Sequence, residues 1–204
     1  MKGQIIVTIN RQYGSGGHEI GRRLAQEMDI AFYDKELLSI TAQRTGMPED
    51  LLSLHDERLS TSSMYLIGAG AFSSEPPLND RIFLAQFKAI KAIAQSESCV
   101  IVGRCSDYVL TEHQHSAHIY IRAPLSERIG RIADMYEVSR KKAKEVIARV
   151  DKQRDNYYQH YTQRRRDDPE NYHLTIDSSA LGVQGSVDTI RRFAELFRDR
   201  QIQG

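Results

Sequence analysis

The sequence has no tryptophan and only two cysteines, Cys99 and Cys105, in 204 residues. Two thiols argue against a disulfide framework and suit a reducing compartment, so we expect a cytoplasmic protein. No apolar run is long enough to span a bilayer, and the chain starts directly into a predicted strand without a targeting segment. We therefore expect neither a membrane protein nor a membrane partner.

The sequence also lacks a dominant charge. Its formal net charge is +1, and hydrophobic and charged residues make up 40% and 27% of the chain. These fractions are ordinary for a globular protein, and so small a net charge gives no general attraction to nucleic acid. The length fits a single domain, and we find no internal repeat. We expect small-molecule partners and leave the oligomeric state open.

A glycine-rich turn near the start of the chain is the most informative stretch. Residues 5–9 read Ile-Ile-Val-Thr-Ile, an apolar and β-branched run that is typical of a buried strand. Residues 14–17 read Gly-Ser-Gly-Gly, and their small side chains let the backbone curl and present its N–H groups. Ile20, Leu24 and Met28 then recur at the spacing of one helix face. Strand, loop and helix in this order predict an anion site at the helix N-terminus.

This turn is a P-loop pattern with one part missing. The usual pattern is G-x-x-x-x-G-K-[ST], in which the Lys reaches the β- and γ-phosphates and the hydroxyl holds Mg²⁺. When Gly16 is aligned with the second glycine, Arg11 takes the place of the first glycine, Gly17 that of the Lys, and His18 that of the hydroxyl. The phosphate cradle is present without its standard cation. A turn made only for packing is the alternative.

Further strands and helices alternate along the chain, which predicts an α/β domain with a mostly parallel sheet. Strands are expected at residues 31–33, 99–102, 118–122 and 172–176, and helices between them. We expect caps at Asn79 or Asp80, at Ser139 and at Ser186. Residues 60–77 are rich in Ser, Gly and Ala, which predicts either a flexible surface loop or a flap over a ligand.

Arginines supply the candidate cations for phosphate chemistry, because charge spreads over the oxygens of a moving phosphoryl group. Arg104 directly follows a strand and a glycine, at the strand end where ligands of open α/β sheets bind. Arg128 and Arg131 are three residues apart on one helix face. Surface ion pairs are the alternative, with Asp151 and Asp155 as partners of the nearby arginines.

Histidines and tyrosines admit two interpretations each. His18 and Glu19 lie in the first turn of the predicted helix, where a carboxylate complements the helix dipole and an imidazole donates to phosphate or water. His113, His115 and His118 are read as a polar turn before a strand rather than a metal cluster. Residues 157–161 carry three tyrosines that either stack on a base or pack the helix onto the domain.

Three segments resemble a known family. Residues 8–17 read Thr-Ile-Asn-Arg-Gln-Tyr-Gly-Ser-Gly-Gly, residues 32–37 read Phe-Tyr-Asp-Lys-Glu-Leu, and residues 102–104 read Val-Gly-Arg. The chain thereby resembles the cytidylate kinase-like branch of the P-loop nucleoside monophosphate kinases. The resemblance implies a three-layer α/β fold of the P-loop NTPase type with a parallel five-stranded sheet. It also implies a helical acceptor-binding insertion at about 34–96 and a helical lid at about 128–165.

The chain departs from the family pattern at several positions. Gly17 replaces the phosphate-loop Lys, and Cys105 replaces an Asp that helps to read cytosine. Tyr158 and Tyr161 replace an Asp and an Arg at the end of the lid, and Ile40 stands in place of an acceptor-binding arginine. The fold survives these changes, but the identity of the acceptor does not follow from the resemblance.

The resemblance implies an ATP-dependent phosphotransferase that moves the γ-phosphoryl group to a nucleoside monophosphate of the cytidylate type. ATP is the expected donor, Mg²⁺ enters with the nucleotide, and we expect no metal site built by the protein alone. The expected residues are Arg11, Arg128, Arg131 and Arg154 for catalysis, Gly14, Ser15, Gly16, Gly17, His18 and Glu19 for the nucleotide, and Asp34, Lys35, Arg81, Gly103 and Arg104 for the acceptor.

Two other functions stay open at this point. The loss of the loop Lys favours a nucleotide-binding sensor or interaction module that kept the fold and lost transfer. The altered acceptor residues leave room for a kinase that acts on a small acceptor other than a nucleotide.

Overall fold

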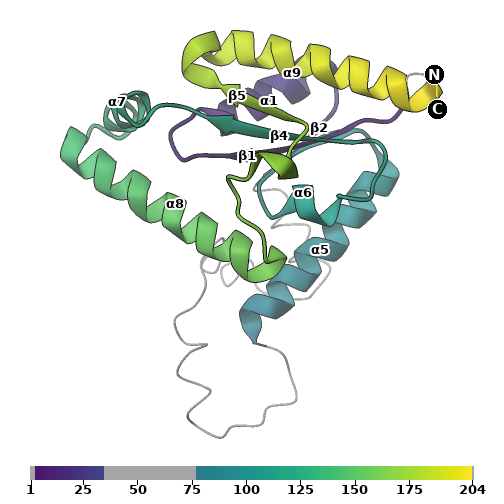
Figure 1. The fold of residues 1–204 in the computed structure, drawn as a ribbon, viewed down its shortest axis with the longest axis horizontal. Helices are drawn as coiled ribbons and strands as arrows, with labels where there is room; N and C mark the ends of the chain where they lie inside the picture. Colours follow the sequence, from purple (N-terminus) through teal and green to yellow (C-terminus); the bar gives the residue numbers. More distant parts are fainter. Residues whose placement is uncertain (1–2, 35–76, 204) are drawn as a thin grey trace, which may run out of the picture.

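The computed structural model describes residues 3–34 and 77–203, and these residues form a parallel sheet covered by helices on both faces (Figure 1). In chain order the elements are β1 (Ile6–Arg11), α1 (Gly17–Met28), β2 (Ala31–Tyr33), α5 (Leu78–Ser96), β3 (Cys99–Val102), α6 (Ser106–Val109), β4 (Ser116–Arg122), α7 (Leu125–Tyr136), α8 (Arg140–Thr162), a 3-10 turn (Pro169–Asn171), β5 (Leu174–Asp177) and α9 (Ser178–Gln203).

The sheet has five parallel strands in the order β2-β3-β1-β4-β5. β1 lies at its centre, with Ile6 opposite both Cys99 of β3 and Ser116 of β4. Every residue of β1 is buried, which explains why Ile6, Val7 and Ile9 do not alternate with exposed polar residues; the polar residues Thr8, Asn10 and Arg11 of this strand are buried too. The predicted parallel five-stranded sheet is confirmed, and each predicted strand overlaps an observed one.

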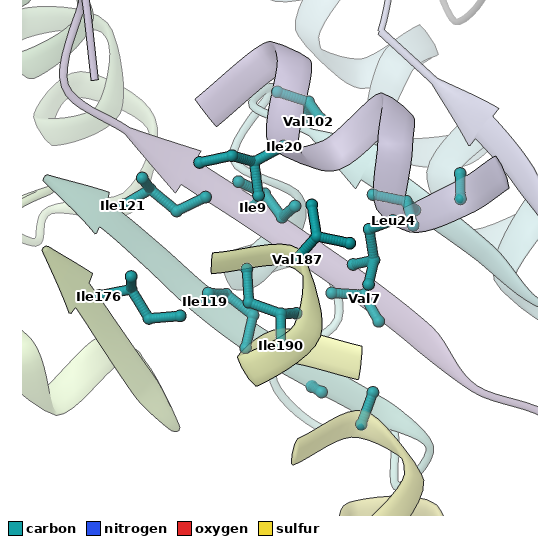
Figure 2. Packing of buried hydrophobic residues seen from close by; sticks show 14 of the residues in the cluster. Val7, Ile9, Ile20, Leu24, Val102, Ile119, Ile121, Ile176, Val187 and Ile190 are labelled. Atoms are coloured by element: carbon teal, nitrogen blue, oxygen red, sulfur yellow. The ribbon is translucent and has the colours of Figure 1, made fainter. Parts of the chain in front are cut away.

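Two apolar layers hold the helices onto the sheet. On one face, side chains of the strands meet Ile20 and Leu24 of α1 and Val187 and Ile190 of α9 (Figure 2). On the other face, Ile6 and Ile101 pack against α5 and α6. Figure 1 shows α1 and α9 on one side of the sheet and α5 and α6 on the other. The result is the predicted three-layer arrangement.

Helix ends agree only in part with the sequence. The Ser139 hydroxyl caps α8 by accepting from the backbone N–H of Lys142 at 3.2 Å, as predicted. The cap of α5 is Pro77, whose carbonyl accepts from the N–H groups of Asp80 and Arg81, so the predicted cap at Asn79 or Asp80 is wrong. The helix starts earlier because the fixed φ of Pro77 suits the position before its first turn.

The last helix also begins before the predicted cap. α9 starts at Ser178 and is interrupted at Gly182, whose φ is 65°. Ser186 lies after this interruption, and its hydroxyl donates to the Gly182 carbonyl at 2.6 Å instead of capping the helix. The predicted cap at Ser186 is therefore wrong, because the glycine and not the serine marks the break.

Several predictions fall outside the described residues. These are Lys35, Ile40, the helix expected after Asp34, the loop over residues 60–76 and most of the acceptor-binding insertion. Among residues 3–34 and 77–203, the helices are too short or too polar for any of them to traverse a lipid bilayer.

Candidate functional site

The glycine-rich turn joins the carboxyl end of β1 to the amino end of α1. Gly14 and Gly16 both have φ of 81°, a left-handed conformation in which a side chain is strained, and Gly16 caps α1. Ser15 is buried, its hydroxyl donates to the Gln12 carbonyl at 2.9 Å, and its own carbonyl accepts from the Ser178 hydroxyl at 2.6 Å. These bonds hold the loop at the N-terminus of α1, and the first N–H groups of a helix are in general suited to an anion.

A cavity of about 270 Å³ lies against this loop. It is bordered by the loop, the first turn of α1, the end of β2, one side of α7 and Arg154 of α8. Predicted site residues from all of these segments line it together, namely Arg11, Gly14, Gly16, Gly17, His18, Glu19, Asp34, Arg131 and Arg154.

Arg11 occupies the space beside Gly17 where the usual loop lysine would start. A Cβ added to Gly17 would lie 2.7 Å from the Cβ and 3.0 Å from the Cγ of Arg11. Both of those atoms are close to the backbone, so no change of rotamer removes the collision at Cβ. Arg11 is 7% exposed and ends β1 directly below the loop. A side chain at position 17 would therefore collide with Arg11, so the absence of the loop Lys and the presence of Arg11 are sterically linked in this structure.

Arg131 places a second guanidinium on the loop. Its Nη1 donates to the Gly14 carbonyl at 3.1 Å and lies 2.6 Å from where a Cβ on Gly16 would be. α7 thus contacts the loop through Arg131. A side chain at position 16 would meet this guanidinium where it now lies, and a glycine leaves room for it.

Arg128 serves a different purpose from Arg131. It is 8% exposed, and it donates to the carbonyls of Ala123 and Tyr13 and to Asp151 Oδ2 at 2.6 Å. Asp151 Oδ1 accepts from the backbone N–H of Tyr13 at 2.8 Å. The prediction that Arg128 and Arg131 share a role therefore does not fit their contacts, because Arg128 ties the loop to α8 while Arg131 lies on the loop itself.

Arg166 is a buried residue that sequence reasoning missed. Its Nε donates to Asp155 Oδ1 at 2.7 Å, its Nη2 lies 3.5 Å from Asp151 Oδ1, and its Nη1 donates to the Arg11 carbonyl. It follows two other arginines in an irregular segment, and nothing in the sequence distinguishes it from them. Together, Arg128 and Arg166 neutralise Asp151 and hold the backbone at Arg11 and Tyr13, where the chain enters the loop.

A smaller cavity lies beside the first one at the carboxyl end of β3. Three successive residues, Gly103, Arg104 and Cys105, have φ between 53° and 83°, and this turn buries the Arg104 side chain to 5% exposure. Burial lowers the pKa of Arg104 to about 10, although the charge of Asp34 acts to raise it. Arg11 and Arg154 line both cavities, so they lie where the two join.

The tyrosines of α8 pack the helix against the rest of the domain, as the second interpretation predicted. Tyr157 and Tyr158 are buried against Cys105, and the Tyr158 hydroxyl donates to the buried Asp107 at 2.5 Å. Tyr161 stacks on Phe83 of α5 with ring centroids 4.0 Å apart. The carboxyl end of α8 is therefore held on α5, where Figure 1 shows the two helices approaching.

The remaining candidates lie elsewhere. Arg81 is exposed in the first turn of α5 and does not line either cavity. His113 and His115 precede β4, and His118 lies in the strand, buried, with its Nδ1 2.8 Å from the Thr8 hydroxyl. Within the described part of the chain, no three His, Cys, Asp or Glu side chains come together as a metal cage.

Comparisons with known proteins agree with this architecture. The model of the cytidylate kinase-like family matches residues 6–180. A solved structure of an uncharacterized protein from Eubacterium ventriosum ATCC 27560 is 26% identical, with a TM-score of 0.72 over 94% of this chain and 99% of that one. Shikimate kinase from Bacteroides thetaiotaomicron is 11% identical, with a TM-score of 0.53 over 94% and 98% of the two chains. None of the curated proteins matches the sequence.

Proposed function

Because the chain belongs to the cytidylate kinase-like family, we propose that it transfers the γ-phosphoryl group of ATP to a small anionic acceptor, with a nucleoside monophosphate of the cytidylate type as the first candidate. The fold of the chain is that of a kinase-like phosphotransferase. The donor and acceptor are our proposal, and they are inferred from the two joined cavities and the cations around them.

The exchange between Arg11 and Gly17 is the observation that carries this proposal. A phosphoryl group in transfer carries negative charge on its oxygens, and catalysis consists mainly of holding cations in place around it. A chain that had merely lost its lysine would have no cation at the loop. Here the Cβ of Arg11 lies 2.7 Å from where a Cβ on Gly17 would be, the Arg11 side chain lines the loop cavity, and Arg131 adds a second cation at the loop. Arg11 would thus supply the positive charge that the loop lysine usually supplies.

The two cavities suggest how donor and acceptor are arranged. The loop cavity, with Gly14 to Gly17, would hold the phosphates of ATP, and Arg104 in the second cavity would hold the acceptor anion. Arg11 and Arg154 line both, so they would lie on either side of the phosphoryl group as it moves. A divalent metal bound with the nucleotide would neutralise negative charge on its phosphate groups. The Asp34 carboxylate in the loop cavity would suit such a metal as a ligand.

A non-nucleotide acceptor is the second candidate, and the packing at Cys105 favours it. In the family pattern this position carries an acid that helps to read cytosine, whereas here it is a thiol packed on Tyr157 and Tyr158. Among the described residues, the second cavity therefore offers guanidinium groups for an anion, and no carboxylate lines it to read a base.

An ADP-release assay tests the proposal directly. ATP with Mg²⁺ or Mn²⁺ is supplied with each ribo- and deoxynucleoside monophosphate in turn, and we expect ADP release that depends on an acceptor. Arg131→Ala should lower turnover by about 10²-fold, as expected for a cation that acts in the transition state. Arg200→Ala, in the last turn of α9, is the matched control and should leave turnover unchanged. Nucleotide binding without release for any monophosphate would favour the binding module or the other acceptor class.

A further inference from the structure

We propose that His18 and Asp34 together bind the divalent metal that accompanies the nucleotide, and that this pair selects a transition-metal ion such as Mn²⁺ over Mg²⁺. The inference rests on the proposed function, because the metal arrives with the nucleotide. It concerns the position that usually carries the metal-binding hydroxyl of a phosphate loop.

The first turn of α1 and the end of β2 bring this pair together. His18 is the second residue of α1, and Asp34 follows the end of β2. His18 Nε2 lies 3.0 Å from Asp34 Oδ2, and the imidazole contacts the Phe32 ring edge-on at 5.5 Å between centroids. Both residues line the loop cavity. The imidazole is therefore turned toward β2, and its Nε2 and the carboxylate meet within the cavity.

The pair is poorly explained as a stabilising ion pair. The His18 side chain is 54% exposed, although that of Asp34 is only 13% exposed, and an ion pair with one partner so open to solvent contributes little to stability. The neighbouring carboxylate of Glu19 is engaged by Arg23 at 2.6 Å, which leaves Asp34 as the acid that meets the imidazole. The Asp34 carboxylate lines the loop cavity, and its charge acts to raise the pKa of Arg104 in the second cavity. A cation at this point would be close to the phosphates of the donor and to the acceptor.

The chemistry of the donor atoms decides which metal fits. Mg²⁺ is a hard cation that takes oxygen ligands in a strict octahedron, and a hydroxyl at this loop position serves it well. An imidazole nitrogen is a common ligand of first-row transition metals, whose affinity for such nitrogen and oxygen sites rises from Mn²⁺ towards Cu²⁺. One imidazole, one carboxylate and the phosphate oxygens form a mixed set that Mn²⁺ or Co²⁺ accepts more readily than Mg²⁺ does.

Pulsed EPR of the full chain with Mn²⁺·ADP tests whether His18 is a ligand. ADP is used because it binds without turnover. We expect a ¹⁴N modulation from a directly bound imidazole, and we expect it to vanish in His18→Ser. The exposed His160→Ser on α8 is the matched control and should keep the modulation. Because His18 is half exposed, its replacement should leave the fold intact, and circular dichroism checks this.

Calorimetry gives a second readout. His18→Ser should weaken Mn²⁺·ADP binding by at least about tenfold and Mg²⁺·ADP binding by less, so the preference for Mn²⁺ falls. Asp34→Asn should weaken Mn²⁺·ADP by about 10- to 100-fold while the ¹⁴N modulation remains. Tight binding of Mn²⁺·ADP without a modulation, or with one that persists in His18→Ser, overturns this inference and leaves the phosphotransferase proposal intact. Absence of nucleotide binding with either metal would overturn both.

Discussion

Restoring the usual phosphate-loop pattern tests the exchange between Arg11 and Gly17. In Gly17→Lys the new Cβ would lie 2.7 Å from the Arg11 Cβ, and neither atom can move without the backbone. Overpacking of this kind costs about 1–3 kcal/mol. Gly17 is not in a left-handed conformation, so its backbone would accept a side chain and the collision with Arg11 is the obstacle. We therefore expect Gly17→Lys to destabilise the fold and to lower turnover, although it adds the residue that most phosphate loops carry.

The variant Arg11→Gly removes the guanidinium of Arg11 from the loop and introduces no collision. Arg11→Gly places the usual first glycine in the loop and should lower turnover by roughly 10²–10³-fold, the loss expected when one preorganised charge is removed from a transition state. The double variant Arg11→Gly, Gly17→Lys removes the collision and returns a cation from the helix side. Its turnover should exceed that of Arg11→Gly by about tenfold or more, a strongly non-additive result for two residues in contact.

Replacing the lysine with alanine separates sterics from charge. Gly17→Ala has the same Cβ as Gly17→Lys and should lose comparable stability in thermal unfolding. The double variant Arg11→Gly, Gly17→Ala should regain that stability but not the turnover, because it carries no cation. Turnover is followed by ADP release and stability by differential scanning fluorimetry. Additive losses in the Lys double variant, or a gain of turnover in Gly17→Lys alone, would refute the reasoning.

Three further predictions concern the acceptor cation, the buried acid and the buried histidine. Arg104→Lys should raise KM for the acceptor more than KM for ATP, because lysine cannot form the bidentate contact of a guanidinium; equal effects on both would count against the assignment. Asp151→Ala leaves the charges of Arg128 and Arg166 without their shared carboxylate and should cost about 3–5 kcal/mol in denaturant unfolding, whereas the exposed Asp188→Ala should cost less than about 0.5 kcal/mol. Burial lowers the pKa of His118 to about 3, so between its ordinary pKa of 6.5 and pH 3 the unfolded chain holds a proton that the folded chain does not. The free energy of unfolding should therefore decrease as the pH is lowered from 6.5 to 3, by at most roughly 1.4 kcal/mol per pH unit from this group. A His118→Asn variant that loses stability equally steeply over the same pH range would contradict the assignment.

Much of the fold was predictable because the strands carry their own signal. Continuous apolar runs such as residues 99–102 mark strands that are buried on both faces, and Ile20 and Leu24 mark the inner face of α1. The helix starts were less predictable. A proline carbonyl at Pro77 and a glycine at Gly182 determine two of them, and capping rules based on side-chain oxygens do not find either.

The candidate site was predictable as a set of residues but not as a set of roles. The loop pattern locates the phosphate-binding turn and shows that Gly17 stands where a phosphate loop usually carries its lysine. The missing lysine is explained by a collision between Arg11 of β1 and any side chain at Gly17 of α1. Because the two residues belong to different elements, the sequence pattern of either element alone does not predict this collision. Spacing likewise puts Arg128 and Arg131 on one helix face, but Asp151 lies on another helix and draws only Arg128 inward. Contacts between elements decide the roles, so the sequence alone left them open.

The departures at the acceptor side form one connected group in space. Cys105 is far in sequence from Tyr158 and Tyr161 of α8, yet the three residues meet in one cluster where α8 packs on α5 and α6. We infer that packing groups stand here in place of the polar groups that the family resemblance assigns to base reading, and a buried acid or cation without a partner would be costly. Under the proposed function, Arg104 and the shape of the site would then contribute to recognition of the acceptor. When two acceptors differ by one apolar group, the shape of a pocket discriminates between them by only about 1–3 kcal/mol. When one acceptor lacks a hydrogen bond that the other makes, the discrimination between them is far stronger. We therefore expect acceptors that share an anionic group but differ in their base to be used at rates within roughly 200-fold of one another.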